Sequence, residues 1–152
     1  MTRTQPTGDP KRILIVDDNK MGLSARRSVL EAVGHTVATA QSGIEALALF
    51  GGGGNFDLVV TDFKMPKMTG VELIAEIRKI SPSLPIILIS GFTDTLGLNE
   101  ANTQADAVLQ KCSNEVSQLM RTVQKLLNKW QRKPPGVSKG SERSTPKRRN
   151  VL

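Results

Sequence analysis

Four short apolar runs, far apart in the chain, each end at a polar group suited to handling phosphate. The first three are ILIVDD (13–18), DLVVTD (57–62) and IILISG (86–91), and the fourth, AVLQK, ends at Lys111. Such runs of Val, Ile and Leu are typical of strands buried on both faces of a parallel sheet. We therefore expect the chain to fold around a parallel sheet.

The polar groups at the ends of these runs are predicted to meet. In an open α/β sheet, ligands bind outside the carboxyl ends of the strands. That edge would gather Asp17, Asp18, Asp62, Ser90 and Lys111. Carboxylates suit Mg²⁺, which prefers oxygen ligands and keeps several waters. The hydroxyl and the amine suit a phosphoryl group, so the crevice is a candidate site for both.

Helical segments alternate with the strands. Apolar spacing predicts helices over 20–33, 44–50, 71–80 and 115–130. The expected strands are 13–17, 35–40, 57–61, 86–89 and 107–111, whereas 92–105 is polar and weakly patterned. This alternation predicts right-handed βαβ units in a three-layer α/β/α sandwich. The expected fold is a flavodoxin-like, doubly wound five-stranded parallel sheet with strand order 2-1-3-4-5.

Composition narrows the class of protein. The single cysteine, Cys112, excludes a disulfide framework and a cysteine-based zinc site, and it fits a reducing compartment. No apolar stretch approaches the ~18 residues of a spanning helix. The first residues lack the apolar middle of a secretory signal. We expect a soluble cytoplasmic protein with no membrane insertion.

The net charge of +7 is concentrated at one end of the chain. Residues 131–152 hold seven basic side chains and one acidic side chain, which leaves 14 basic and 13 acidic groups in residues 1–130. We expect a flexible leader over 1–10, one domain over 11–133 and a disordered basic tail over 134–152. The tail is either merely solvated or a weak site for nucleic acid.

Several motifs together resemble the response regulator receiver domain of two-component signalling. They are VDDN (16–19), the segment 34–50, DLVVTDFKMPKMTG (57–70), ISGF (89–92) and Lys111. The resemblance spans about residues 11–133 and implies a Mg²⁺ cofactor. By position, Asp18 would bind the ion directly and Asp17 mainly through water, with Asp62 and the backbone carbonyl of Lys64 as further ligands.

The same resemblance implies a role in phosphoryl transfer. Asp62 would be the phosphorylated carboxylate, Ser90 would hydrogen-bond the phosphoryl group and Lys111 would pair with it. The implied donor is a sensor histidine kinase or a histidine phosphotransfer protein, and the implied output is contact with a downstream protein target or onward phosphorelay. The expected protein is a stand-alone switch rather than an enzyme, catalysing only its own phosphorylation and dephosphorylation.

Other interpretations stay open at this point. The aspartates at 17 and 18 could cap the following helix, and Asp62 could be an ordinary turn residue. A nucleic-acid-binding regulator would use the basic tail as its effector. A metal-dependent phosphatase is disfavoured because Asp62-Phe63-Lys64 lacks a second acid two residues on. The four glycines at 51–54 predict a connector, since no Lys-Ser/Thr pair follows them.

Two positions depart from the receiver pattern. Cys112 follows Lys111, where receivers commonly have proline, so we expect a trans bond there. Val108 stands in the fifth strand where receivers often have Tyr or Phe. The coupled rotation of a hydroxyl and an aromatic ring therefore cannot operate in its aromatic form.

Overall fold

The structure, a computed structural model, describes residues 10–91 and 97–132. The predicted leader, apart from Pro10, and the predicted tail lie outside the described residues, as does Phe92. The proposed binding of nucleic acid by the tail therefore stays a prediction.

Five parallel strands form one sheet in the order β2-β1-β3-β4-β5, which confirms the predicted fold. The elements are β1 Arg12–Val16, α1 Lys20–Ala32, β2 Thr36–Ala40, α2 Gly43–Gly51, β3 Leu58–Asp62, α3 Gly70–Ile80, β4 Ile86–Ser90, α5 Glu100–Thr103, β5 Ala107–Gln110 and α6 Glu115–Arg132. The register pairs Asp62 with Ile89 and Ser90 with Gln110, so the carboxyl ends of neighbouring strands are level.

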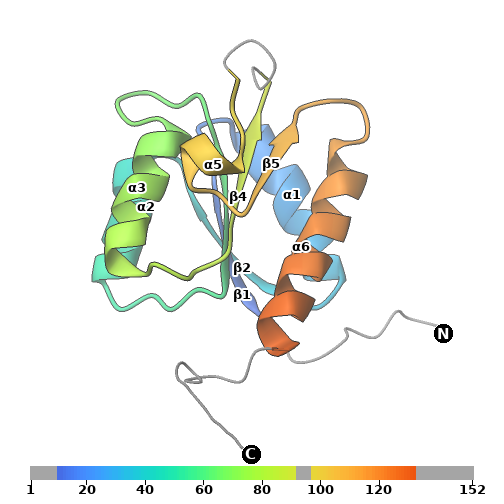
Figure 1. The fold of residues 1–152 in the computed structure, drawn as a ribbon. Coiled ribbons are helices and arrows are strands. Elements are labelled where there is room, and N and C mark those ends of the chain that lie inside the picture. The colour runs from blue at the N-terminus through green and yellow to red at the C-terminus, as the bar shows by residue number, and fades with distance from the viewer. Residues whose placement is uncertain (1–9, 92–96, 133–152) are drawn as a thin grey trace, which may run out of the picture.

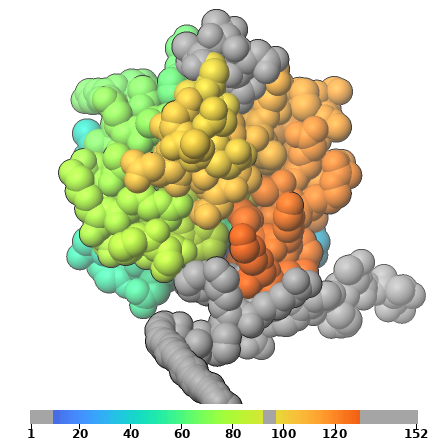
Figure 2. All heavy atoms as spheres, viewed as in Figure 1, coloured from blue at the N-terminus to red at the C-terminus, as the bar shows by residue number. Residues whose placement is uncertain are grey.

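Helices cover both faces of the sheet, with α2 and α3 on one side and α1 and α6 on the other (Figure 1). The space-filling view shows α5 at the surface between α3 and α6 (Figure 2). Alternate residues of each strand enter opposite cores: Leu14 and Val16 pack toward α2 and α3, whereas Ile13 and Ile15 pack toward α1 and α6. This explains why the strands are continuous apolar runs rather than alternating ones.

The expected helices are present, and three begin at a capping side chain. Asn19, Ser42 and Thr69 accept hydrogen bonds from the first turns of α1, α2 and α3, and Thr69 forms a capping box with Glu72. The weakly patterned segment contains only the four-residue α5 among its described residues. Its start at Asn99 is fixed by reciprocal bonds with Asn102.

The buried faces of the helices differ in part from the apolar spacing. On α1, Arg26 is buried together with Leu23 and Leu30, while Ala25 is exposed. On α6, Leu127 is buried, whereas Val116 is 39% exposed. On α3, Leu73 is buried and Ile80 is exposed. The apolar periodicity of these helices is otherwise matched by burial, since Leu23, Ile74 and Leu119 are all buried.

Candidate metal and phosphoryl site

A pocket of about 570 Å³ opens at the carboxyl edge of the sheet. It is lined by Asp17, Asp18, Asn19, Asp62, Lys64, Met65, Pro66, Ser90, Gly91 and Lys111. Every residue that the sequence placed in the candidate site therefore lines one pocket. The roles assigned to these residues remain predictions.

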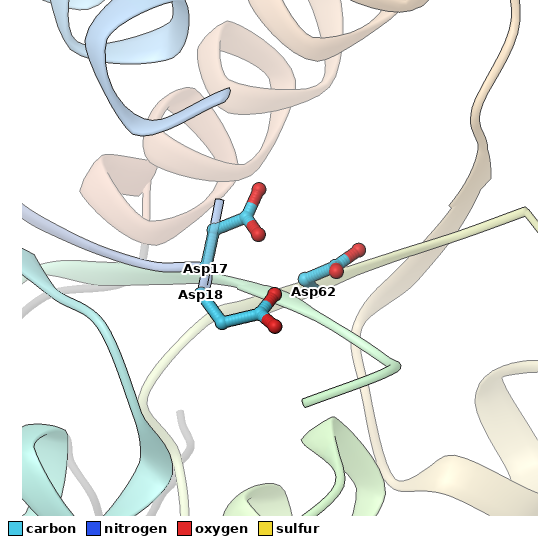
Figure 3. A group of neighbouring side chains, drawn as sticks. All are labelled: Asp17, Asp18 and Asp62. Atoms are coloured by element: carbon cyan, nitrogen blue, oxygen red, sulfur yellow. The ribbon is translucent and has the colours of Figure 1, made fainter. Parts of the chain in front are cut away.

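Three carboxylates gather in this pocket from the ends of adjacent strands. Asp17 and Asp18 follow β1, and Asp62 ends β3 (Figure 3). One ligand oxygen of each lies within 4.8 Å of the others. Asp17 is 1% exposed and Asp62 3% exposed, whereas Asp18 is open to solvent. Like charges this close and this buried call for a cation among them.

Asp17 is held by the protein at both of its oxygens. Its Oδ1 accepts the Asn19 backbone N–H at 2.9 Å, and its Oδ2 accepts Arg26 Nη1 at 2.7 Å. Asn19 is the N-cap of α1, so neither Asp17 nor Asp18 serves as that cap. Asp17 is thus fixed in orientation, while Asp18 is exposed and within reach of an ion.

Asp62 is paired with a lysine and still carries an unfavourable charge. Lys111 Nζ lies 2.9 Å from Asp62 Oδ1. Burial raises the pKa of Asp62 above its ordinary value, the Lys111 hydrogen bond opposes that rise, and the nearby Asp17 charge adds to it. The carboxylate is therefore more basic than an ordinary aspartate, a property that suits a nucleophile.

The loop after Asp62 is fastened closely to the sheet. The Phe63 N–H donates to the Ile89 carbonyl at 2.9 Å, and the Gly70 N–H donates to the Phe63 carbonyl at 2.8 Å. A Cβ on Gly70 would collide with the backbone carbonyl of Asp62. Within this loop, Lys67 adopts a left-handed conformation with φ 71°. Such backbone strain is common near functional sites.

The donor set fits Mg²⁺. The side chains of Asp17, Asp18 and Asp62 offer carboxylate oxygens, and the pocket contains no histidine or cysteine among its lining residues. Hard cations such as Mg²⁺ take oxygen ligands, whereas zinc favours nitrogen and sulfur. Lys64 lines the same pocket, and the role of its carbonyl as a ligand stays a prediction.

Sequence reasoning missed Arg26, Glu115 and Gly22 near the site. Arg26 is 4% exposed, and its guanidinium bonds both Asp17 and Glu115. A sequence signal existed, because position 26 lies three residues after Leu23 and four before Leu30, both buried. An arginine on the apolar stripe of a helix requires a buried acidic partner.

The structure shows the surroundings of the two residues that depart from the receiver pattern, Cys112 and Val108. No peptide bond is cis in residues 10–91 and 97–132, so the expected trans bond before Cys112 is confirmed. Lys111 still reaches Asp62 through its flexible stem. Val108 is partly buried in β5, where it packs against the α2 and α3 side of the core.

None of the helices in the described part of the chain is long and apolar enough to cross a bilayer.

The comparisons with known proteins agree with this geometry. The model of the response regulator receiver domain family matches residues 13–124. The chain is 32% identical over 127 residues to sensor kinase CckA of Brucella abortus, an alignment that covers 83% of this chain and 13% of that protein. The chain thus spans a small part of that relative's length.

Solved structures give the same result. The response regulator TrrA of Thermotoga maritima, in complex with Mg²⁺-BeF, is 35% identical with a TM-score of 0.68, over 76% of this chain and 98% of TrrA. A second structure holds TrrA in complex with the histidine kinase ThkA. It is 36% identical with a TM-score of 0.68, over 77% of this chain and 98% of that one.

Proposed function

The chain belongs to the response regulator receiver domain family, and on that premise we propose that Asp62 accepts a phosphoryl group from a phosphohistidine. The donor is a sensor histidine kinase or a histidine phosphotransfer protein, and the complex of the similar TrrA with a kinase supports the first. One observation carries the proposal: Asp62 is buried at the end of β3, beside two carboxylates and Lys111.

The transfer is a displacement at phosphorus. An Asp62 oxygen forms the new P–O bond, the P–N bond to the donor histidine breaks, and the imidazole leaves with the bond's electron pair and takes up a proton. Lys111 bonds Asp62 Oδ1 at 2.9 Å, which supports a role for its ammonium in offsetting the charge that develops on the phosphoryl oxygens. We expect Lys111 to move from the carboxylate to a phosphoryl oxygen of the product.

Repulsion between the carboxylates and the phosphoryl group is the main obstacle. Asp18 would hold Mg²⁺ directly and Asp17 mainly through water, with Asp62 and the Lys64 carbonyl completing the set. The similar TrrA binds Mg²⁺-BeF, which supports this assignment. When bound, Mg²⁺ offsets the charge of the carboxylates and of the phosphoryl oxygens.

The phosphorylated form would act as a switch. Ser90 is 1% exposed and lines the pocket, which supports a hydrogen bond from its hydroxyl to the phosphoryl group. That bond would favour one of two arrangements of the following loop. The output would be contact with a downstream protein or onward phosphorelay. We expect no turnover beyond the protein's own phosphorylation and dephosphorylation; action without an attached output domain stays a prediction.

The test uses a small phosphodonor. Acetyl phosphate with Mg²⁺ should add one phosphoryl group to the parent, measured by mass spectrometry, and none to Asp62→Asn. Asp57→Asn is the matched control, because Asp57 lies at the other end of β3 and bonds the Arg12 backbone N–H. Modification of Asp62→Asn, or modification of the parent in excess chelator, would overturn the proposal.

A further inference from the structure

Arg26 is a buried cation that the proposed transfer does not use. Its guanidinium donates from Nη1 to Asp17 Oδ2 at 2.7 Å. On its other side, Nε and Nη2 both lie 2.8 Å from Glu115 Oε2. Glu115 is the first residue of α6, and its side chain is 17% exposed. A carboxylate of the pocket is thereby joined through one guanidinium to a different helix.

The close approach of α1 to Asp17 depends on a glycine. A Cβ on Gly22 would lie 2.6 Å from Asp17 Oδ2 and 3.8 Å from Arg26 Nη1. Asp17 could not yield easily, because its short side chain is held at both oxygens. Glycine within a helix normally destabilises it relative to alanine. Gly22 therefore provides the space that the Asp17–Arg26 contact occupies.

We propose that Arg26 and Glu115 form a charge relay through which α6 tunes the Mg²⁺ affinity of the acidic pocket. The relay rests on the proposed function, since it regulates the same site. Arg26 places a positive charge against Asp17, which disfavours a second cation there. Glu115 offsets that charge from the other side of the guanidinium, because it bonds Nε and Nη2 whereas Asp17 bonds Nη1.

Burial makes this pair more effective than an exposed one. The side chain of Arg26 is 5% exposed, whereas that of Lys111, which pairs with Asp62, is 41% exposed. Water and salt screen exposed charges strongly and buried charges much less. A change in the partner of Arg26 therefore alters the affinity of the acidic pocket for Mg²⁺. By linkage, binding of the ion alters the interaction between Arg26 and Glu115.

The experiment measures Mg²⁺ affinity by calorimetric titration of the full chain at low ionic strength. Glu115→Gln keeps an acceptor for Arg26 but removes the offsetting charge, so the affinity should fall about fivefold. Glu31→Gln is the matched control on α1, where Glu31 pairs with the exposed Arg27. Its affinity should stay within about twofold of the parent.

A second variant separates charge from structure. Arg26→Met combined with Glu115→Gln removes both charges of the relay, so the affinity should return to within about twofold of the parent. A merely structural pair would leave the double variant no tighter than Glu115→Gln. Thermal unfolding of each variant confirms that the titrated protein is folded. If the double variant does not fold, the relay is judged by the Mg²⁺ affinity of Glu115→Gln compared with that of Glu31→Gln.

The outcomes distinguish this inference from the function on which it rests. A parent that does not bind Mg²⁺ would remove the proposed function and the relay together. A parent that binds Mg²⁺ while Glu115→Gln matches Glu31→Gln would overturn the relay alone. A fivefold loss that the double variant fails to restore would also overturn it, because charge balance would then not be the cause.

Discussion

The two ends of β3 carry the same residue in opposite settings. Asp57 precedes the strand and its Oδ2 accepts the Arg12 backbone N–H at 2.8 Å. Asp62 ends the strand, is 3% exposed, and lies among other carboxylates with its pKa raised chiefly by burial. Residue type therefore does not decide the role of these aspartates; the edge of the sheet at which they lie does.

The direction of the strands explains the difference. The amino edge of a parallel sheet presents backbone N–H groups that lack strand partners, and a carboxylate satisfies them. Asp106 does so as well, accepting the Ile86 N–H at 2.8 Å and Arg78 Nη2 at 3.0 Å. The carboxyl edge presents carbonyls instead, which cannot neutralise a carboxylate. Acidic groups gathered there must be offset by cations.

The acidic residues at the two edges of the sheet differ in whether they stabilise the fold or form the candidate site. At the amino edge each acid completes the hydrogen bonding of a strand end, so its contribution is structural. At the carboxyl edge the acids are crowded, and the free energy that this crowding costs would be available for the proposed binding of Mg²⁺ and a phosphoryl group. Functional sites commonly hold such locally unfavourable arrangements.

Gly70→Ala should have the largest effect on folding, because a Cβ there meets the backbone of Asp62 rather than a movable side chain. We expect a loss of about 3 kcal/mol in the free energy of unfolding, measured by urea denaturation. Gly51→Ala is the control, since nothing lies within 4 Å of its Cβ position. Its change should stay within about 0.5 kcal/mol. Equal stabilities for the two variants would show that the carboxyl edge is loosely packed.

The strands and the site edge could be predicted because each depends on a local pattern. A strand buried on both faces must be apolar throughout, and a parallel sheet brings its carboxyl ends together whatever the side chains are. Asp17, Asp62 and Ser90 were therefore placed by topology alone. Their presence in one pocket could be predicted without knowledge of long-range contacts.

The rest could not be predicted because it depends on contacts between distant segments. Arg26 pairs with Glu115 across 89 residues, and its burial is possible only with that partner. The polar segment before β5 forms α5 through the Asn99–Asn102 capping box and the Gln104 left-handed residue, patterns too short for apolar periodicity to reveal. In both cases polar side chains, not apolar ones, determine the local structure.

Replacing Asp57, which precedes β3, and Asp62, which ends it, should change stability in opposite directions. Asp57→Asn weakens a bond to a backbone N–H and should lower the free energy of unfolding by about 1 kcal/mol. Asp62→Asn removes a buried charge from beside Asp17 and should raise it by about 1 kcal/mol near neutral pH. Denaturant titration of each variant measures the two changes in the free energy of unfolding. Two changes of the same sign would contradict the division between the edges.

The pH dependence gives that comparison a second measure. Because the folded pKa of Asp62 is raised, the folded state holds its proton more tightly than the unfolded state does. The stability from this proton is present at acid pH and is lost as pH rises through the folded pKa. The advantage of Asp62→Asn over the parent should therefore grow from acid to neutral pH. A constant gap would show that Asp62 has an ordinary pKa.

His35 offers the smallest test, at the amino edge. Its Nδ1 accepts the Lys11 backbone N–H at 3.2 Å, which requires a neutral ring. Burial chiefly lowers the pKa of His35, the Lys11 charge lowers it further, and Asp57 opposes both. The unfolded state then binds the proton more readily, so stability is present above the ordinary pKa of histidine and is lost as pH falls from there through the lowered pKa of the folded state.

His35→Gln should remove this acid-side loss of stability. Since the ring is only half-buried, water screens its charge, and the parent should lose no more than about 2 °C of melting temperature relative to the variant between about pH 8 and pH 5.5. The ring titration followed by NMR should give a pKa below the ordinary value. A pKa above it would mean that the Asp57 charge outweighs burial, and that the amino edge, like the carboxyl edge, is governed by its charges rather than by its backbone hydrogen bonds.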